Sequence, residues 1–186
     1  MNRSVRAVVS VLVVTLGLLL GVGAIAVSNR SVAEASSAPC HSSWLTAKVG
    51  RGSAAAGTAY ITLEIINHET SACTLTGTPI AQPGFHSYSM QPFVAVGPRA
   101  VRITYPGRGH TILLKPHGVA SVDFGISTAG NYPPSQCGPR NISAVELTFK
   151  MRTLSIRLDY PLRTQSVCTK LVSTQIAGVV LGTHFP

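Results

Sequence analysis

Apolar and polar residues alternate with a period of two in several parts of the chain, which is the pattern of a half-buried β-strand. The clearest example is a pair of neighbouring segments near the C-terminal end, which a tight turn at Met151-Arg152 would join. The turn would set three pairs of matching side chains opposite each other: Leu147 with Ile156, Phe149 with Leu154, and Glu146 with Arg157. Because apolar residues then face apolar ones and an acid faces a base, we expect an antiparallel hairpin here.

A second hairpin is expected near the start of the folded region. Residues 45–49 predict a short strand, and residues 60–66 are a β-rich run with Ile61, Leu63 and Ile65 on one face. The sequence GRGSAAAG at residues 50–57 separates them and predicts a flexible connection.

The remaining strands are short and are separated by turn signals. They are predicted at residues 93–96, 101–105, 111–114, 119–126 and 174–181, and Pro- and Gly-containing pairs such as Pro83-Gly84 punctuate the segments between them. About eight short antiparallel strands without a helical period favour an all-β fold, a sandwich of two sheets. Residues 36–186 are expected to form it as a single domain.

The N-terminus predicts an export segment over residues 1–35. Arg3 and Arg6 precede an uncharged apolar stretch at residues 7–27, and Ala33-Glu34-Ala35 fits a cleavage site. The alternative is an uncleaved anchor helix, because that stretch is long enough to span a bilayer, and membrane contact is expected only there. Either outcome makes the domain secreted or attached to the cell envelope, outside the cytoplasm.

The four cysteines predict two disulfides, with a zinc site as the rival interpretation. Three pairings are possible, and the strand pattern chooses among them. Cys137 and Cys168 are centred on the C-terminal hairpin, and Cys40 and Cys73 are centred on the 50–57 connection. We therefore expect Cys40 to pair with Cys73 and Cys137 to pair with Cys168, each bridge bracketing a hairpin.

Charge adds a candidate binding region. Residues 36–186 hold twelve Lys and Arg against five Asp and Glu, a net charge of +7, and residues 70–122 contain no acid. Five basic residues fall within this acid-free stretch, in the region 99–115: Arg99, Arg102, Arg108, His110 and Lys115. They predict a site for an anionic cell-envelope polymer or a protein partner, against the alternative of a generally basic surface. Nucleic acid is not an expected partner, because no repeat of basic and aromatic residues is present.

Catalytic chemistry has little support. The chain lacks the nucleophile-elbow, P-loop, zinc-protease and dinucleotide-binding motifs, and its few acids make a paired-carboxylate hydrolase improbable. No catalytic residue, cofactor or metal ligand is predicted, and we expect no enzyme. The alternative is a metal-handling protein or an enzyme whose site is built from dispersed histidines, which are His41, His68, His86, His110, His117 and His184.

Two motifs resemble a known family. Tyr60, Leu63 and Asn67 precede the run Cys73-Thr74-Leu75-Thr76-Gly77-Thr78-Pro79, and Leu114-Lys115-Pro116-His117-Gly118-Val119-Ala120 follows. They resemble the secreted actinobacterial family called domain of unknown function 4232, which reads roughly Y-x-x-L…N…C-T-L-x-G-x-P and then L-x-P-G-x-x-A. His117 departs from the second motif by separating Pro116 from Gly118. The resemblance covers most of residues 40–172 and implies an export signal, an immunoglobulin-like sandwich and no established activity.

Overall fold

The computed structural model of the protein describes residues 37–86, 92–151 and 155–183. The predicted export segment at residues 1–35, including the apolar stretch at residues 7–27, lies outside these ranges. Within the described ranges, no helix is long and apolar enough to cross a membrane. The described chain consists mainly of strands, which confirms the all-β prediction.

Twelve strands and three short helical turns occur in the described ranges. The strands are β1 (Leu45–Ala55), β2 (Thr58–Asn67), β3 (Cys73–Leu75), β4 (Ile80–His86), β5 (Phe93–Ala95), β6 (Val101–Ile103), β7 (Ile112–Leu114), β8 (Val119–Ser127), β9 (Pro139–Lys150), β10 (Ser155–Cys168), β11 (Thr174–Ala177) and β12 (Val180–Leu181). The turns are η1 (Ser42–Trp44), η2 (Ala129–Asn131) and α2 (Pro134–Cys137). The prediction of about eight strands was too low, because it missed the three-residue β3, took Pro83-Gly84 within β4 as a turn, and joined β11 and β12 into one strand.

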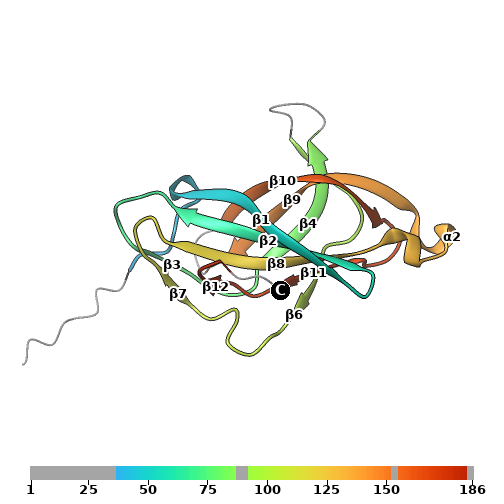
Figure 1. The fold of residues 1–186 in the computed structure, drawn as a ribbon. Coiled ribbons are helices and arrows are strands. Elements are labelled where there is room, and N and C mark those ends of the chain that lie inside the picture. Colours follow the sequence, from blue (N-terminus) through green and yellow to red (C-terminus); the bar gives the residue numbers. More distant parts are fainter. Residues whose placement is uncertain (1–36, 87–91, 152–154, 184–186) are drawn as a thin grey trace, which may run out of the picture. The chain divides into compact units, whose positions relative to one another are not determined.

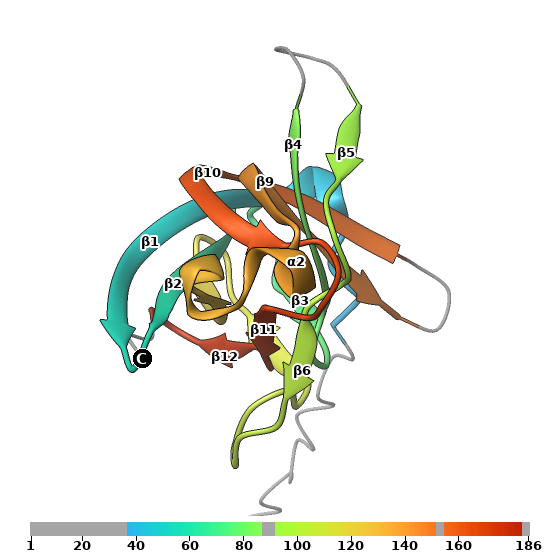
Figure 2. The same ribbon diagram turned by 90° about the vertical axis from the view of Figure 1, so that its right-hand side faces the viewer.

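Two main sheets form the sandwich. In Figure 1, the sheet that contains β1, β2 and β8 lies in front of the sheet that contains β9 and β10. The six-stranded sheet has the order β1-β2-β8-β11-β6, and β12 pairs with β8 beside β11. The four-stranded sheet has the order β10-β9-β4-β5, and β3 and β7 form a separate ribbon. Figure 2 shows the two layers from the end that carries α2. The pairing is antiparallel except between β11 and β6, which are parallel, a departure from the expected all-antiparallel arrangement.

Both sheets contribute their inner faces to one core. Leu63 and Phe124 of the six-stranded sheet pack with Leu147, Phe149 and residues of β10, all almost inaccessible to water. Tyr160 of β10 is also buried, and its hydroxyl donates a hydrogen bond across the core to the Glu64 carbonyl at 3.0 Å. Burial raises the pKa of the Tyr160 phenol far above its usual range, so the group stays a neutral donor.

The C-terminal hairpin is present, but its register differs from the predicted one by two residues. β9 ends at Lys150 and β10 begins at Ser155, so four residues connect them instead of two. Ile156 therefore lies opposite Phe149, and Glu146 lies opposite Asp159 instead of Arg157. Since a shift of two residues keeps every side chain on its face, alternation alone does not separate the two registers. The expected partner Leu154 lies outside the described residues.

The shifted register gives Glu146 a mixed environment. Its carboxylate is paired diagonally with Arg157, with Nε and Oε2 3.2 Å apart, while Asp159 lies directly opposite. Burial raises the pKa of Glu146 above its ordinary value; Arg157 opposes this rise, Asp159 adds to it and His86 opposes it. Folding therefore favours the protonated form, and the charged form costs stability as the pH rises through the raised pKa.

Glu146→Gln is therefore expected to gain stability relative to the parent as the pH rises from about 4 to 7. Denaturant unfolding of both proteins across that range measures the difference. Asp159→Asn serves as the companion variant, and it should lower the pKa of Glu146 in a carboxyl NMR titration. A stability difference that stays constant or moves toward the parent with rising pH would contradict this account.

The N-terminal hairpin is longer than predicted, because the Gly- and Ala-rich segment is part of β1. Its strand pairs with β2 as far as Ala55 opposite Thr58, with a bulge between Val49 and Gly52. A Cβ atom on Gly52 would lie 2.8 Å from the Tyr60 carbonyl oxygen, so the close approach of the backbones requires glycine. Ala56 and Gly57 form the two-residue turn, both with positive φ, which matches the twist of a β-hairpin.

Pro83 and Gly84 lie inside β4, where the sequence predicts a turn. The Ala81 and Pro83 carbonyls accept hydrogen bonds from the N–H groups of Ala100 and Val96. Both residues thus direct their main-chain polar groups away from β9, because N–H and C=O of one residue point the same way in an antiparallel strand. The missing N–H of Pro83 therefore costs the β4–β9 ladder nothing.

Both disulfides join the residues that the strand pattern pairs. Cys40 and Cys73 are 33 residues apart and bracket the β1–β2 hairpin, and Cys137 and Cys168 are 31 residues apart and bracket β9–β10. The first bridge belongs to the main core, whereas the second lies in a small separate cluster with Ala129, Tyr132 and Leu171. All four cysteines are thus oxidised, which fits an oxidising compartment outside the cytoplasm.

Candidate functional site

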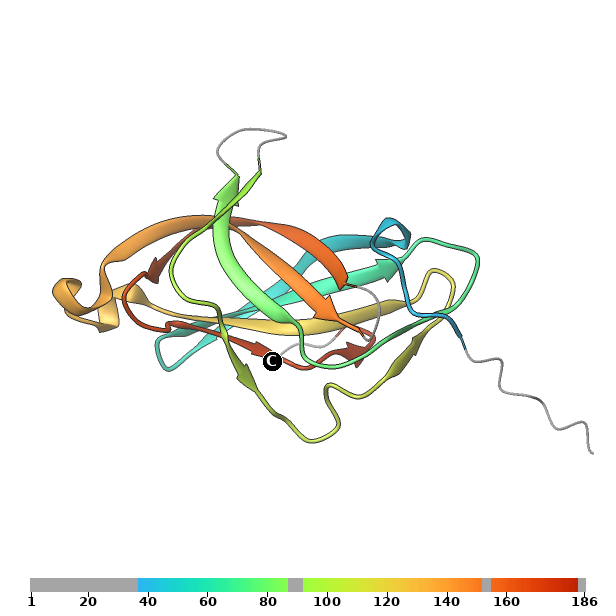
Figure 3. The ribbon, with the colours of Figure 1, turned by 180° about the vertical axis from the view of Figure 1, so that it is seen from behind.

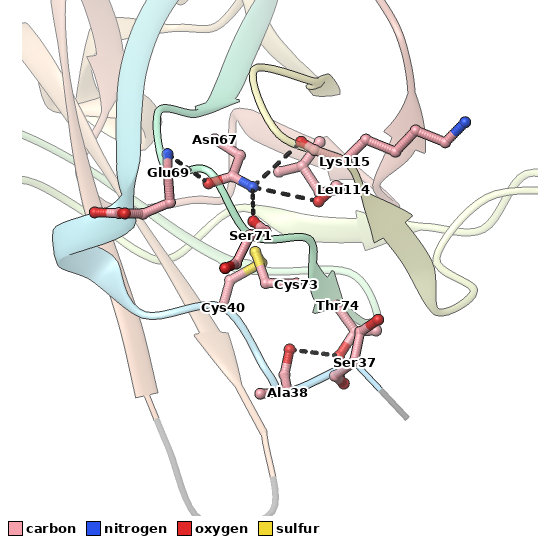
Figure 4. The surroundings of a disulfide bond; sticks show 10 residues. All are labelled: Ser37, Ala38, Cys40, Asn67, Glu69, Ser71, Cys73, Thr74, Leu114 and Lys115. Atoms are coloured by element: carbon pink, nitrogen blue, oxygen red, sulfur yellow. Dashed lines mark hydrogen bonds between the residues drawn. A yellow bond between two sulfur atoms is a disulfide. The ribbon is translucent and has the colours of Figure 1, made fainter. Parts of the chain in front are cut away.

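The motif residue Asn67 has a structural role beside the first disulfide (Figure 4). Asn67 is fully buried at the end of β2. Its amide nitrogen donates to the carbonyls of Ser71, Leu114 and Lys115 at 2.8, 3.3 and 3.2 Å, and its amide oxygen accepts from the Glu69 N–H. This one side chain joins the β2–β3 connection to the turn between β7 and β8. The motif therefore marks a corner of the fold.

The second motif forms that turn between β7 and β8. Gly118 N–H donates to the Lys115 carbonyl, and the Gly118 carbonyl accepts from Asn67 N–H. His117, which interrupts the expected Pro-Gly pair, has a positive φ of 56° and an exposed side chain. The inserted histidine occupies the left-handed position that glycine would fill more easily.

The five predicted anion-binding residues lie in different environments. Arg99, in the connection from β5 to β6, is exposed, and so are Arg102, His110 and Lys115. Arg102 of β6 is the partner of Ile176 in β11, and Ile176 faces the core. The Arg102 side chain therefore leaves the edge of the sheet on the same side as Ile176. Arg108 lies instead on the outer face of the six-stranded sheet, since its partner is Asp123 there. The five residues therefore do not form a single cluster in the structure.

Arg108 and Asp123 form a nearly buried ion pair. The Arg108 Nη1 group donates to Asp123 Oδ2, and their side chains are only 11% and 7% exposed. Asp123 comes from the middle of β8, and Arg108 comes from the loop between β6 and β7. The same guanidinium lies over the Tyr105 ring, 5.3 Å from its centroid. Because an acid neutralises it, Arg108 is a poor candidate for a free anion-binding cation.

The five histidines that the structure describes show no arrangement that would support the metal alternative, and the sixth, His184, lies outside the described residues. The five that the structure describes are exposed and lie on separate elements: His41, His68, His86, His110 and His117. The His41 and Trp44 rings are in tilted contact, with centroids 4.6 Å apart, and His86 contacts Phe93 edge-on. Over residues 37–86, 92–151 and 155–183, no three His, Cys, Asp or Glu side chains are grouped to hold a metal ion.

The ion pair lies in a groove on the outer face of the six-stranded sheet, which we call the outer-face groove. The groove has a volume of about 670 Å³. It is lined by residues of β1, β2, β6, β8, β11 and the β6–β7 loop: Ser53, Ala54, Ala55, Tyr60, Ile103, Tyr105, Pro106, Arg108, Asp123, Gly125, Gln175 and Ala177. Its size lies within the range of small-ligand sites.

The floor of the outer-face groove is a row of matched positions on three strands. Tyr60 of β2 and Gln175 of β11 both lie opposite Gly125 of β8. The Gln175 side chain crosses over Gly125, and its amide donates to the Tyr60 hydroxyl at 3.2 Å. A Cβ atom on Gly125 would lie 2.7 Å from Gln175 Cγ, so glycine leaves the space for this crossing.

The β6–β7 loop contributes Tyr105, Pro106 and Arg108 to the lining of the groove. Figure 3 shows this loop running below the C-terminal strands β11 and β12. Arg108 N–H donates to the Tyr105 carbonyl within the loop, and Gly109 N–H donates to the Val179 carbonyl at 3.1 Å. A Cβ atom on Gly178 would lie 2.5 Å from the Gly109 nitrogen, so the two backbones touch. These contacts fix the position of Arg108 above β8.

Sequence reasoning missed the outer-face groove, although β8 carries a signal. Residues 120, 122, 124 and 126 are apolar and face the core, while Ser121, Asp123 and Gly125 face outward and are covered as well. A lone acid between small residues on a strand that is otherwise apolar is unusual for a solvated face. That pattern marks the outer side of β8 as a covered polar surface.

A second hollow, of about 640 Å³, lies between the β4–β5 pair and the start of β9. Phe85 and Gly97 border it on one side, and Arg140, Asn141 and Ser166 border it on the other. Arg140 and Asn141 are exposed, and Phe85 and Ser166 are partly so. Without a buried polar side chain aimed into it, this hollow is the weaker candidate.

The comparison with protein-family models gives one match. The family described as Domain of unknown function (DUF4232) matches residues 40–176, a span that contains all four cysteines, Asn67 and the floor of the groove. No curated protein and no solved structure matches the chain.

Proposed function

Because the chain belongs to the DUF4232 family, whose description names no activity, we propose its function from its charge, disulfides and fold. The protein is an exported, non-catalytic binding module of the cell envelope. It recognises anionic envelope components, such as an acidic polymer or an acidic protein partner, through its exposed cations. Its secretion and the removal or retention of residues 1–35 are part of this proposal.

The observation that carries the proposal is the excess of cations. The described residues include eleven Lys and Arg but only five Asp and Glu, so more than half of the cations have no acid available to neutralise them. Two of the acids, Glu64 and Glu146, are already close to Lys48 and Arg157. A net positive surface attracts anionic polymers and speeds their encounter.

The candidate contact region is the exposed part of the predicted site. Arg99, Arg102, His110 and Lys115 remain in it, and Arg108 is removed from it because of its pairing with Asp123. The two disulfides fit this role, since they would hold the fold together outside the cell.

The combined replacement of Arg99, Arg102 and Lys115 by Ser is expected to weaken adsorption to isolated cell-envelope fragments by about 100-fold at low salt, at roughly 1 kcal/mol per cation near an anionic surface. The melting temperature should stay nearly unchanged, because all three side chains are exposed. Sedimentation of the protein with the fragments measures the adsorption, and added salt should weaken it further.

The matched control removes three exposed cations from the other sheet, by replacing Arg140, Lys150 and Arg163 with Ser. It carries the same net charge as the first variant but keeps the candidate region. Equal weakening by both variants would show a generally basic surface without a specific region. Unchanged adsorption in both would remove the charge-based proposal.

A further inference from the structure

We propose that the outer-face groove binds a neutral sugar ring of a glycan. This inference rests on the groove alone and is independent of the exposed cations used above. It assigns a ligand class to a surface that has no role in the proposed adsorption to anionic material.

The floor of the groove carries polar groups that suit the hydroxyls of a sugar. A carboxylate, a guanidinium, a primary amide and a phenol converge there from four elements: Asp123 of β8, Arg108 of the β6–β7 loop, Gln175 of β11 and Tyr60 of β2. The guanidinium has five N–H donors, and the amide has both a donor and an acceptor end. Adjacent hydroxyls of a sugar ring each donate and accept, so a planar polar group can hold two of them at once.

The ion pair adds no net charge to the groove floor. Arg108 and Asp123 neutralise each other within the groove, and both side chains are nearly buried. An anionic or cationic ligand would bring an uncompensated charge into this partly desolvated site, which is unfavourable. A neutral ligand with many hydrogen-bonding groups avoids that cost.

The groove also has an apolar wall. Ile103, Tyr105, Pro106 and Ala177 line the groove beside the polar floor. Tyr105 is 43% exposed, so its ring is accessible at the rim. A sugar ring presents C–H groups on its faces and hydroxyls at its edge, and aromatic side chains suit such amphipathic surfaces. Wall and floor therefore complement the two kinds of surface on one ring.

The site is preformed, because contacts within the protein hold its side chains and its loop in place. Gln175 is positioned by its hydrogen bond to Tyr60 and by its passage over Gly125, and the loop is held by Gly109 and Gly178. A ligand that enters such a site loses less free energy to the ordering of side chains. The volume of about 670 Å³ also has room for one or two sugar rings.

The test is saturation-transfer NMR on the oxidised protein with methyl glycosides of glucose, mannose, galactose and N-acetylglucosamine, each at millimolar concentration. Methyl glucuronide is the charged comparison. The proposal expects transfer to at least one neutral glycoside, with the signal from the ring protons. Tyr105→Ala should weaken binding by about tenfold, whereas Tyr105→Phe should keep it.

Two further variants keep the test decisive if Tyr105→Ala disturbs the loop. Gly125→Ala should displace Gln175 into the groove and weaken binding, since only a flexible side chain has to move. Leu113→Ala is the matched control, because Leu113 is also 43% exposed but lies on β7, outside the groove. It should leave binding unchanged.

Three results would overturn the inference. The first is the absence of transfer to every neutral glycoside in the panel. The second is binding that is equal in the parent, Tyr105→Ala and Gly125→Ala. The third is preferential binding of the glucuronide. The variants of the adsorption experiment leave the groove intact. A negative glycoside-binding result would therefore not affect the cationic-surface proposal, and a negative adsorption result would not affect the inference about the groove.

Discussion

Replacing Cys40 and Cys73 together by Ala is expected to lower the free energy of unfolding by at least about 3–4 kcal/mol, the loop-closure contribution of a bridge of this span. The two disulfides close loops of nearly equal length, 33 and 31 residues, so this contribution should be nearly the same for both. Cys40 and Cys73 also pack in the main core, whereas Cys137 and Cys168 lie in a small satellite cluster. The loss should therefore be larger for the Cys40 and Cys73 pair than for the other.

Denaturant unfolding of the two double-Ala variants measures this order. The parent protein under strong reductant serves as the control, and it should unfold near the midpoint of the variant that lacks all four cysteines. Losses below about 1 kcal/mol for both pairs, or a larger loss for Cys137 and Cys168, would contradict the assignment of the first bridge to the core.

Arg108→Ala is expected to lower the free energy of unfolding by about 3 kcal/mol, because it leaves the Asp123 carboxylate in the sheet without its guanidinium. Asp123 is fixed on the central strand β8 and cannot turn to solvent. Asp123→Ala should cost less, about 1–2 kcal/mol, because the long Arg108 side chain can turn into water from its fixed backbone position. The order of the two losses is thus set by which partner is mobile.

The double variant Arg108→Met with Asp123→Leu distinguishes a broken ion pair from lost packing. It replaces both charges by apolar groups of similar volume and should recover stability to within about 1 kcal/mol of the parent. Equal losses in Arg108→Ala and Asp123→Ala, with no recovery in the double variant, would show that the pair has no special burial cost. Chemical denaturation of the four proteins under one set of conditions decides this.

The sequence predicts those strands whose own residues alternate between apolar and polar. The alternation in residues 145–150 and in 60–66 reflects burial on one face, and it locates β9 and β2 without knowledge of their partners. The cysteine pairing follows from the same patterns, because each pair is nearly symmetric about a hairpin. The midpoint of Cys137 and Cys168 also agrees with the observed register of β9 and β10 next to their turn, which our turn placement missed by two residues.

The parts that were missed depend on contacts between distant segments. Gly52 belongs to a strand because the β2 backbone approaches it closely, and Pro83 is tolerated in β4 because its N–H position lies away from β9. Neither contact can be predicted from the local composition of the sequence. The same limit explains Arg108, which the charge count places in a basic cluster but which the fold pairs with an acid 15 residues away.

Prediction of the outer-face groove likewise requires knowledge of the order of the strands in the sheet. Tyr60, Gly125 and Gln175 become neighbours only once β2, β8 and β11 are aligned in register. The family match adds a boundary, residues 40–176, but no residue role. The proposed ligand site therefore depends on side chains that the sheet brings together from separate segments of the chain.

We propose that this protein works outside the cytoplasm as a disulfide-bridged sandwich. Non-reducing peptide mapping of the protein recovered from its native cells tests it most directly. We expect it in the envelope or culture fluid, with Cys40 linked to Cys73 and Cys137 linked to Cys168. Recovery from the cytoplasm with four free thiols, or a link between Cys40 and Cys168, would contradict the account.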